Sequence, residues 1–215
     1  MHPKSKALNT QFILPGSKNH YSPSRFFKTR HIFLDLLVDF ERKTLFGKSN
    51  LLLKAVKSGE SEVLVDAVNM DILEVEMSQI RDQRINQKAE FSYDQKQIRI
   101  NLPHQTILDE EFNVSIKYKV VSPDFGITFV GPDEANANKP VQIWTQGESE
   151  GSRYWYPCLD SPKQITTTEI KVRIPKGMKS VSNGLIQMSV DDVETGDKLI
   201  GEYGEYLNGS YTLHH

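Results

Sequence analysis

One short acidic segment holds the densest set of side chains that could do chemistry. The amide Gln146 and the carboxylates Glu148 and Glu150 occupy alternate positions. If this segment is extended, alternate side chains project on the same side, so the three acceptors would form a row. Such a row could receive an ammonium group through charge-assisted hydrogen bonds. The alternative is a solvated turn in which Arg153 pairs with one carboxylate, and the residue chemistry alone favours this alternative.

The histidines and the cysteine do not form a recognisable catalytic or metal-binding set. The chain has six histidines and one cysteine. His214 and His215 are adjacent, and adjacent side chains on a strand point to opposite faces, so both cannot easily bind one ion. A catalytic zinc site needs about three protein ligands, and no such set can be assembled. Cys158 could be a nucleophile with a histidine partner, but its place after Trp155-Tyr-Pro favours a buried, inert thiol.

The composition narrows the class of protein. Of the 215 residues, 25% are charged and 38% are apolar, and the net charge is −2. These values are typical of a globular chain and exclude a collagen-like or low-complexity one. No basic field indicates nucleic-acid binding, and no apolar run is long enough to span a membrane. The single cysteine and the lack of a secretory signal in residues 1–30 predict a cytoplasmic protein.

The elements that must position these side chains are predicted to be strands. From residue 29 onward, apolar and polar residues alternate with a period of two. The candidate strands are 31–40, 45–56, 62–68, 72–77, 89–93, 97–102, 112–121, 126–130, 141–145, 168–174, 180–182, 186–190, 198–206 and 211–215. The best helical candidate, 77–89, is polar on nearly every face. We therefore predict an all-β fold with little or no helix, built as a large antiparallel sheet or sandwich.

The two ends of the chain differ from its middle. Residues 1–28 are predicted to be an extended leader, because they contain turn-forming breaks at Pro15-Gly16 and Ser22-Pro23. Their lysines and arginines would also suit a basic arm that touches RNA or membrane, but an extended leader is favoured. Residues 29–215 are predicted to be a single all-β domain. Because 210–215 resembles a strand that is still running, we expect the chain to be truncated after residue 215.

Several strings resemble the N-terminal domain of M1-family zinc aminopeptidases. The most specific are Trp144-Thr-Gln-Gly-Glu-Ser-Glu150 and Ser152-Arg-Tyr-Trp-Tyr-Pro-Cys-Leu-Asp-Ser-Pro162. Residues 14–21 resemble the leader of bacterial members, 31–40 resemble their first strand, and 174–184 resemble a later Ser-Asn-Gly turn. The resemblance covers nearly the whole chain in the family's order.

This resemblance implies a saddle-shaped all-β domain, the first domain of a longer multidomain protein. The domain would cap the active site of a catalytic domain that binds Zn²⁺ through His-Glu-x-x-His, which this sequence lacks. The position matching Glu148 would help to bind the α-amino group of a peptide substrate, and that matching Gln146 would line the same pocket. Gly147 and Glu150 belong to the same loop and are weaker candidates. The parent would be a metallo-aminopeptidase, and this chain would not be catalytic alone.

The implied partners are the amino terminus of a peptide substrate and the protein's own catalytic domain. No cofactor, nucleic acid or membrane is expected for this chain, and the exposed docking surface predicts self-association at high concentration. One alternative is a non-catalytic interaction module resembling the peptidase-like TATA-binding-protein-associated factor two. Another is a carbohydrate-binding sandwich that uses Trp144 or Trp155 as a stacking platform.

Overall fold

The computed structural model describes residues 26–79, 87–192, 197–205 and 212–214, and it is built almost entirely of strands. The all-β prediction is confirmed: in the described residues the one helical element is the single 3-10 turn η1 (Ser152–Tyr154). No helix in this part of the chain is long and apolar enough to cross a membrane. The predicted leader 1–28 lies outside the described residues up to residue 25.

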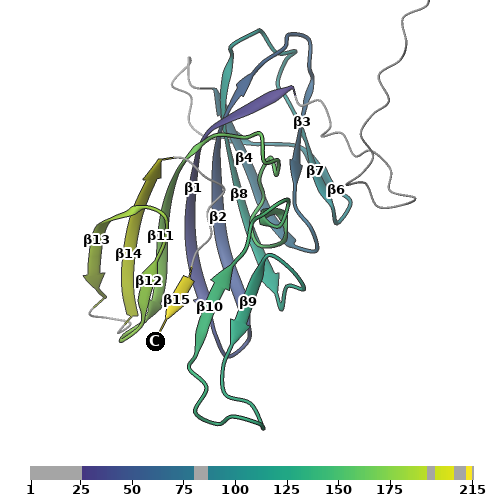
Figure 1. Ribbon diagram of the computed structural model, residues 1–215. Coiled ribbons are helices and arrows are strands. Elements are labelled where there is room, and N and C mark those ends of the chain that lie inside the picture. The colour runs from purple at the N-terminus through teal and green to yellow at the C-terminus, as the bar shows by residue number, and fades with distance from the viewer. Residues whose placement is uncertain (1–25, 80–86, 193–196, 206–211, 215) are drawn as a thin grey trace, which may run out of the picture.

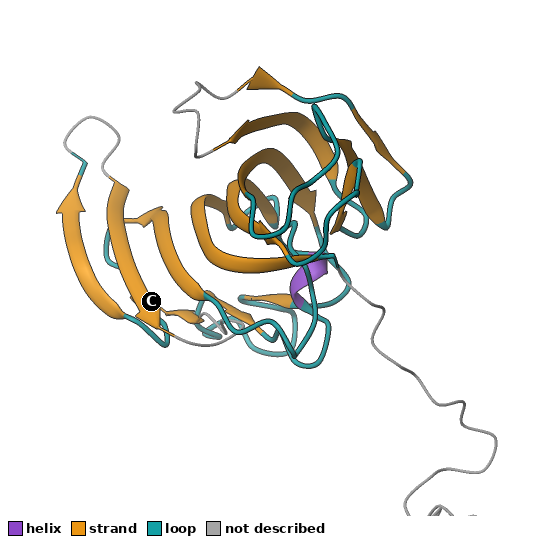
Figure 2. Cartoon of the chain, turned by 90° about the horizontal axis from the view of Figure 1, so that it is seen from above, coloured by secondary structure: helices purple, strands orange, loops and turns teal. Residues whose placement is uncertain are grey.

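Eight strands form one large mixed sheet (Figure 1). Their order across the sheet is β13 (Leu185–Asp191), β14 (Asp197–Glu205), β11 (Thr167–Pro175), β1 (Phe27–Asp39), β2 (Thr44–Ala55), β8 (Glu111–Val121), β4 (Asp71–Gln79) and β5 (Gln87–Lys88). Seen from above, the sheet is strongly curved (Figure 2). Strands this long and twisted tend to curl rather than stay flat.

β1 and β2 form a hairpin at the centre of this sheet. β1 and β2 pair antiparallel from Phe27 opposite Ala55 to Asp39 opposite Thr44. Along the second half of β1, Leu34, Leu36 and Val38 are buried and alternate with more exposed residues. This is the pattern expected when one face of a strand packs against a core and the other is solvated.

Two smaller sheets complete the fold. The four-stranded sheet has the order β12 (Lys179–Val181), β15 (Thr212–His214), β10 (Gln142–Thr145) and β9 (Ile127–Val130). The three-stranded sheet has the order β3 (Glu62–Asp66), β7 (Gln97–Asn101) and β6 (Phe91–Tyr93). Each small sheet contributes side chains with almost no exposed surface to the core, among them Ile143 from the first and Val63 from the second.

The core lies between the large sheet and the two small ones. A small apolar cavity marks the layer shared with the four-stranded sheet, and it is lined by side chains of both. Its lining includes Leu36 of β1, Val172 of β11, Ile127 of β9 and Ile143 of β10, with Trp155 from the loop that follows η1. Trp155 is 1% exposed and is the largest fully buried side chain in the described residues.

Two details of the sequence reading need correction. The sequence predicts an antiparallel sheet, whereas β1 and β11 run parallel, with His31 opposite Thr167. The chain leaves the four-stranded sheet after β10 and returns to the large sheet through residues 146–166, which is the crossover that a parallel pair requires. The predicted strand 89–93 is also too long: β6 begins at Phe91, and Ala89 and Glu90 belong to no strand.

The environment of His31 predicts a pH dependence of stability. Its Nδ1 lies 2.8 Å from Oγ1 of Thr167, and its ring stacks on that of Tyr203. Burial lowers the pKa of His31 below 6.5, outweighing the carboxylate of Glu169, which raises it. The unfolded chain then takes up the proton first as pH falls, so stability contributed by neutral His31 is lost between the unfolded and the folded pKa. We expect the urea midpoint to fall as pH drops below 6.5, and to fall less in His31→Asn; equal pH slopes would contradict this.

Candidate functional site

The three acceptors do not form the row that an extended segment would give. β10 ends at Thr145, and the chain turns at residues 148–151. The amide of Gly151 donates to the carbonyl of Gly147 at 2.7 Å, which closes the turn. The extended arrangement of residues 146–150 is therefore wrong, and the solvated-turn alternative describes the segment. Gln146, Glu148 and Glu150 are exposed, whereas Gly147 is buried beneath them.

Two glycines allow this turn to pack against the neighbouring loop. A Cβ at Gly126, which has a φ of +79°, would lie 2.1 Å from the carbonyl oxygen of Gly151. A Cβ at Gly151 would lie 2.4 Å from the carbonyl oxygen of Gln146. Both contacts are with backbone atoms that cannot move aside easily. The amide of Gln146 also donates to the carbonyl of Gly126 at 2.9 Å, so the start of the turn is fixed to the loop before β9.

The two carboxylates of the turn have different surroundings. Glu150 pairs with Arg153, its Oε2 lying 3.1 Å from Nη2. Glu148 makes no ion pair with any residue that the structure describes, and its side chain is exposed. The structure thus decides which of the two carboxylates pairs with Arg153, a choice that the residue chemistry alone left open. Glu148 is the carboxylate of this turn that is open to an external cation.

Arg153 connects the turn to a buried carboxylate. Its Nε donates to Oδ2 of Asp160 at 3.0 Å, its Nη2 donates to the Asp160 carbonyl at 3.0 Å, and its backbone amide donates to the same Oδ2 at 3.1 Å. The Asp160 side chain is fully buried and that of Arg153 is 21% exposed. Bidentate recognition of this kind suits the planar guanidinium.

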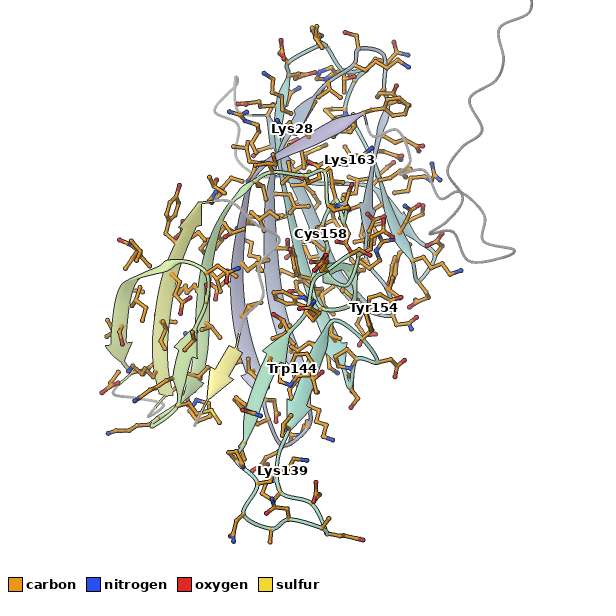
Figure 3. The ribbon with its side chains drawn as sticks, in the orientation of Figure 1. Lys28, Lys139, Trp144, Tyr154, Cys158 and Lys163 are labelled. Atoms are coloured by element: carbon orange, nitrogen blue, oxygen red, sulfur yellow. The ribbon has the colours of Figure 1, made fainter. Side chains whose placement is uncertain are left out.

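The network continues into the three-stranded sheet. The amide of Asp160 donates to Oδ2 of Asp66, at the end of β3, at 3.0 Å. Oδ1 of Asp66 accepts from Nε2 of Gln97 on β7 at 2.9 Å. The backbones of Asp66 and Cys158 also exchange two hydrogen bonds. The segment from Trp144 to Cys158 therefore runs from the four-stranded sheet to the three-stranded sheet, and Figure 3 labels Trp144, Tyr154 and Cys158 along it.

Burial and charge act against each other at Asp160 and Arg153. Burial raises the pKa of Asp160, and the contacts with Arg153 offset only part of that effect. Burial by itself lowers the pKa of Arg153, but the hydrogen bond to Asp160 and the carboxylates of Asp66, Asp160 and Glu150 outweigh it, so the pKa is raised. Arg153 is thus held firmly in its charged form.

An exposed aromatic surface lies beside the turn. Trp144 on β10 is 41% exposed, and Val181 on β12 is 56% exposed. Both stand opposite Thr212 of β15, so they belong to the same, outer face of the four-stranded sheet. Phe125 is also exposed, and its ring meets that of Tyr154 edge to face at 5.3 Å. We call the surface formed by Trp144 and its neighbour Val181 the outer aromatic face.

The cysteine and the adjacent histidines are the remaining candidates from the sequence. Cys158 is buried, with 3% of its surface exposed, as predicted. His215 lies outside the described residues, so the adjacent-histidine pair has no description here. Sequence reasoning missed Asp66 and Gly126 altogether. Neither carries a local signal, since Asp66 meets Asp160 across 94 positions of sequence.

The fold and this turn define an all-β domain of one large and two small sheets that carries an acidic turn beside an exposed aromatic face. Comparison with protein families gives a match to the peptidase M1 N-terminal domain over residues 17–205. The chain belongs to this family.

The chain is also similar to individual proteins. It is 23% identical over 167 residues to leucine aminopeptidase 2 of Phaeosphaeria nodorum, covering 75% of this chain and 26% of that protein. It is 23% identical over 178 residues to transcription initiation factor TFIID subunit 2 of Schizosaccharomyces pombe, covering 67% of this chain and 14% of that protein. The fold matches an M1 zinc metallopeptidase from Deinococcus radiodurans with a TM-score of 0.72 at 17% identity, over 88% of this chain and 42% of that one.

Proposed function

We propose that this chain is the substrate-binding N-terminal domain of a zinc aminopeptidase that removes N-terminal residues from peptides. The domain caps the active site, and Glu148 accepts the α-amino group of the substrate. The proposal is supported by the family, and by the aminopeptidase relatives, of whose length the chain spans about a quarter. The observation that carries the role of Glu148 is its exposure and its lack of an ion pair with any described residue, beside a Glu150 that is paired with Arg153.

A carboxylate is the group that this role requires. A free peptide amino terminus is a cation at neutral pH, and a carboxylate accepts charge-assisted hydrogen bonds from it. An acylated amino terminus or an internal peptide bond offers no such cation. A carboxylate beside the reacting centre therefore favours cleavage next to a free amino terminus. Gln146, exposed at the start of the same turn, offers an amide for a further hydrogen bond.

The outer aromatic face supports the proposal that a partner domain packs against this end of the molecule. Aromatic side chains are enriched where protein surfaces meet, and single exposed ones are common elsewhere. Here Trp144 precedes the turn on the same strand, so a domain that receives Glu148 in its active site would also cover Trp144. The catalytic domain of the same protein is the partner that fits this arrangement.

The zinc ion would belong to that other domain. Among the described residues, no group of three or more His, Cys, Asp or Glu side chains is placed to hold a metal ion. These residues do not fit a zinc site, and the metal would be held by residues of the catalytic domain. The chemistry that this chain supplies is recognition and orientation of the substrate amino group.

Isolated from a catalytic domain, the 215-residue chain is expected to show no peptidase activity. Its acidic turn can bind an amino group, but the described residues provide no activated nucleophile. Aminoacyl-arylamide substrates, with and without added Zn²⁺, measure this directly. A full-length M1 aminopeptidase under the same conditions serves as the positive control. Turnover above background that co-purifies with the chain would contradict the proposal.

A second candidate function is a non-catalytic interaction module. The similarity to the TFIID subunit favours it, since that protein is named as a transcription factor subunit. The two candidates differ in what the acidic turn does. An amine-binding role predicts that peptides with free amino termini bind at Glu148. An interaction module does not require the turn to bind an amino group. A His-Glu-x-x-His motif in the same open reading frame would favour the peptidase.

A further inference from the structure

The turn that holds Glu148 is attached at both ends, but by different means. At its start, a backbone hydrogen bond from Gln146 to the carbonyl of Gly126 joins it to the loop before β9. At its end, Arg153 pairs with Glu150 at 3.1 Å and with the buried carboxylate of Asp160 at 3.0 Å. Asp160 is in turn bonded to Asp66 of the three-stranded sheet. Turns with exposed side chains open locally unless contacts of this kind hold them.

We propose that Arg153 is a positioning residue that fixes the turn so that Glu148, and not Glu150, is presented to the substrate amino group. The inference rests on the proposed function of Glu148. It extends that function by assigning Glu150 to an internal ion pair and Asp160 to the anchor beneath it. Glu150 is then a tether rather than an amine ligand.

The geometry shows why an arginine is needed here. The guanidinium reaches three acceptors that lie in different directions: a carboxylate oxygen of Asp160, the Asp160 carbonyl and Glu150. An ammonium group can supply charge at one point, but it lacks the planar arrangement of several donors. Arg153→Lys is therefore expected to keep the buried charge pair while loosening its geometry. Arg153→Met leaves Asp160 buried without its partner, which is costly.

Backbone amide exchange of the 215-residue chain tests the positioning role without any activity measurement. The Gly151 amide, bonded to Gly147 at 2.7 Å, is the probe. We expect its exchange to be faster by about tenfold in Arg153→Lys, and by about twofold to fivefold in Glu150→Gln. Arg42→Met is the matched control, because Arg42 pairs with Asp39 at the same i, i+3 spacing on the exposed turn between β1 and β2. Exchange equal to wild type in both Arg153→Lys and Glu150→Gln would overturn the proposal.

Steady-state kinetics separate the positioning role of Arg153 from the amine-binding role of Glu148. They are measured on the protein that carries this chain together with its catalytic domain. We expect Arg153→Lys to raise KM for a dipeptide arylamide about tenfold, with kcat changed far less, and Glu150→Gln to have a smaller effect in the same direction. If Glu148→Gln raises KM while Arg153→Lys does not, the positioning role is wrong and the amine site stands. If Arg153→Lys loosens the turn but Glu148→Gln leaves KM unchanged, the proposed function of Glu148 fails. An effect of Glu150→Gln as large as that of Glu148→Gln would make Glu150 an amine ligand and overturn the inference.

Discussion

Replacing Glu148 by Gln in the protein that carries this domain is expected to raise KM for peptide substrates by about two orders of magnitude. The physical reason is the loss of a charge. Gln keeps the size of the side chain and one acceptor oxygen, but it cannot form a charge-assisted bond to an ammonium group. Removing one partner of a desolvated charge pair costs about 2–5 kcal/mol. A smaller fall in kcat is expected, because the amino group also orients the scissile bond.

The measurement is steady-state hydrolysis of a dipeptide arylamide by wild type and variant. Glu150→Gln is the matched control, since Glu150 lies in the same turn but is paired with Arg153 at 3.1 Å. The Glu148 effect should also disappear for any substrate whose amino group is acetylated, because no cation remains to be bound. Unchanged KM in Glu148→Gln would remove Glu148 from the amine site.

The second large effect concerns stability and contrasts the two tryptophans of the chain. Trp155→Ala is expected to lower the free energy of unfolding by about 3–5 kcal/mol, the range for an aromatic side chain removed from a packed core. Trp155 is 1% exposed, and its ring meets that of Tyr156 edge to face at 4.3 Å. It also lines the apolar layer between the large sheet and the four-stranded sheet. Its removal would leave a cavity where those two layers meet.

Trp144→Ala is the matched control, because Trp144 is 41% exposed on the outer face of β10. Surface substitutions away from special features usually change stability by no more than about 0.5 kcal/mol. Urea unfolding followed by circular dichroism measures both variants without relying on tryptophan fluorescence. Similar midpoints for Trp155→Ala and wild type would show that Trp155 does not hold the layers together. A large loss of stability in Trp144→Ala would show that the outer aromatic face is part of the core.

Much of the fold could be predicted because strand periodicity is a local property. The alternation around Ile32, Leu34 and Leu36 predicts a strand with one buried face, and β1 has that pattern. The short polar segment after it predicts the hairpin to β2, which the structure confirms. The parallel pairing of β1 with β11 could not be predicted in this way, since it depends on where residues 146–166 cross the molecule.

Gly47 shows what a local pattern cannot explain. A glycine in the middle of β2 weakens a strand on propensity alone. In the structure the ring of Tyr118, opposite it on β8, covers this position, and a Cβ at Gly47 would lie 2.3 Å from Cζ of the ring. The glycine makes room for a fully buried aromatic side chain on the neighbouring strand. Burial raises the pKa of Tyr118 well above its usual value, so the ring is neutral.

By itself, the sequence determined the strand-rich architecture and the chemical character of the site. Alternating apolar residues and the pair of glutamates after β10 are both readable along the chain, because each depends on neighbours a few positions away. Only the tertiary structure decided that the acidic segment is a turn, that Glu150 is occupied and that Glu148 is open. Those outcomes depend on Gly126 and Asp160, which meet the turn through close backbone contact and a buried ion pair. The partner that anchors Asp160 is itself 94 positions away, where no local pattern could indicate it.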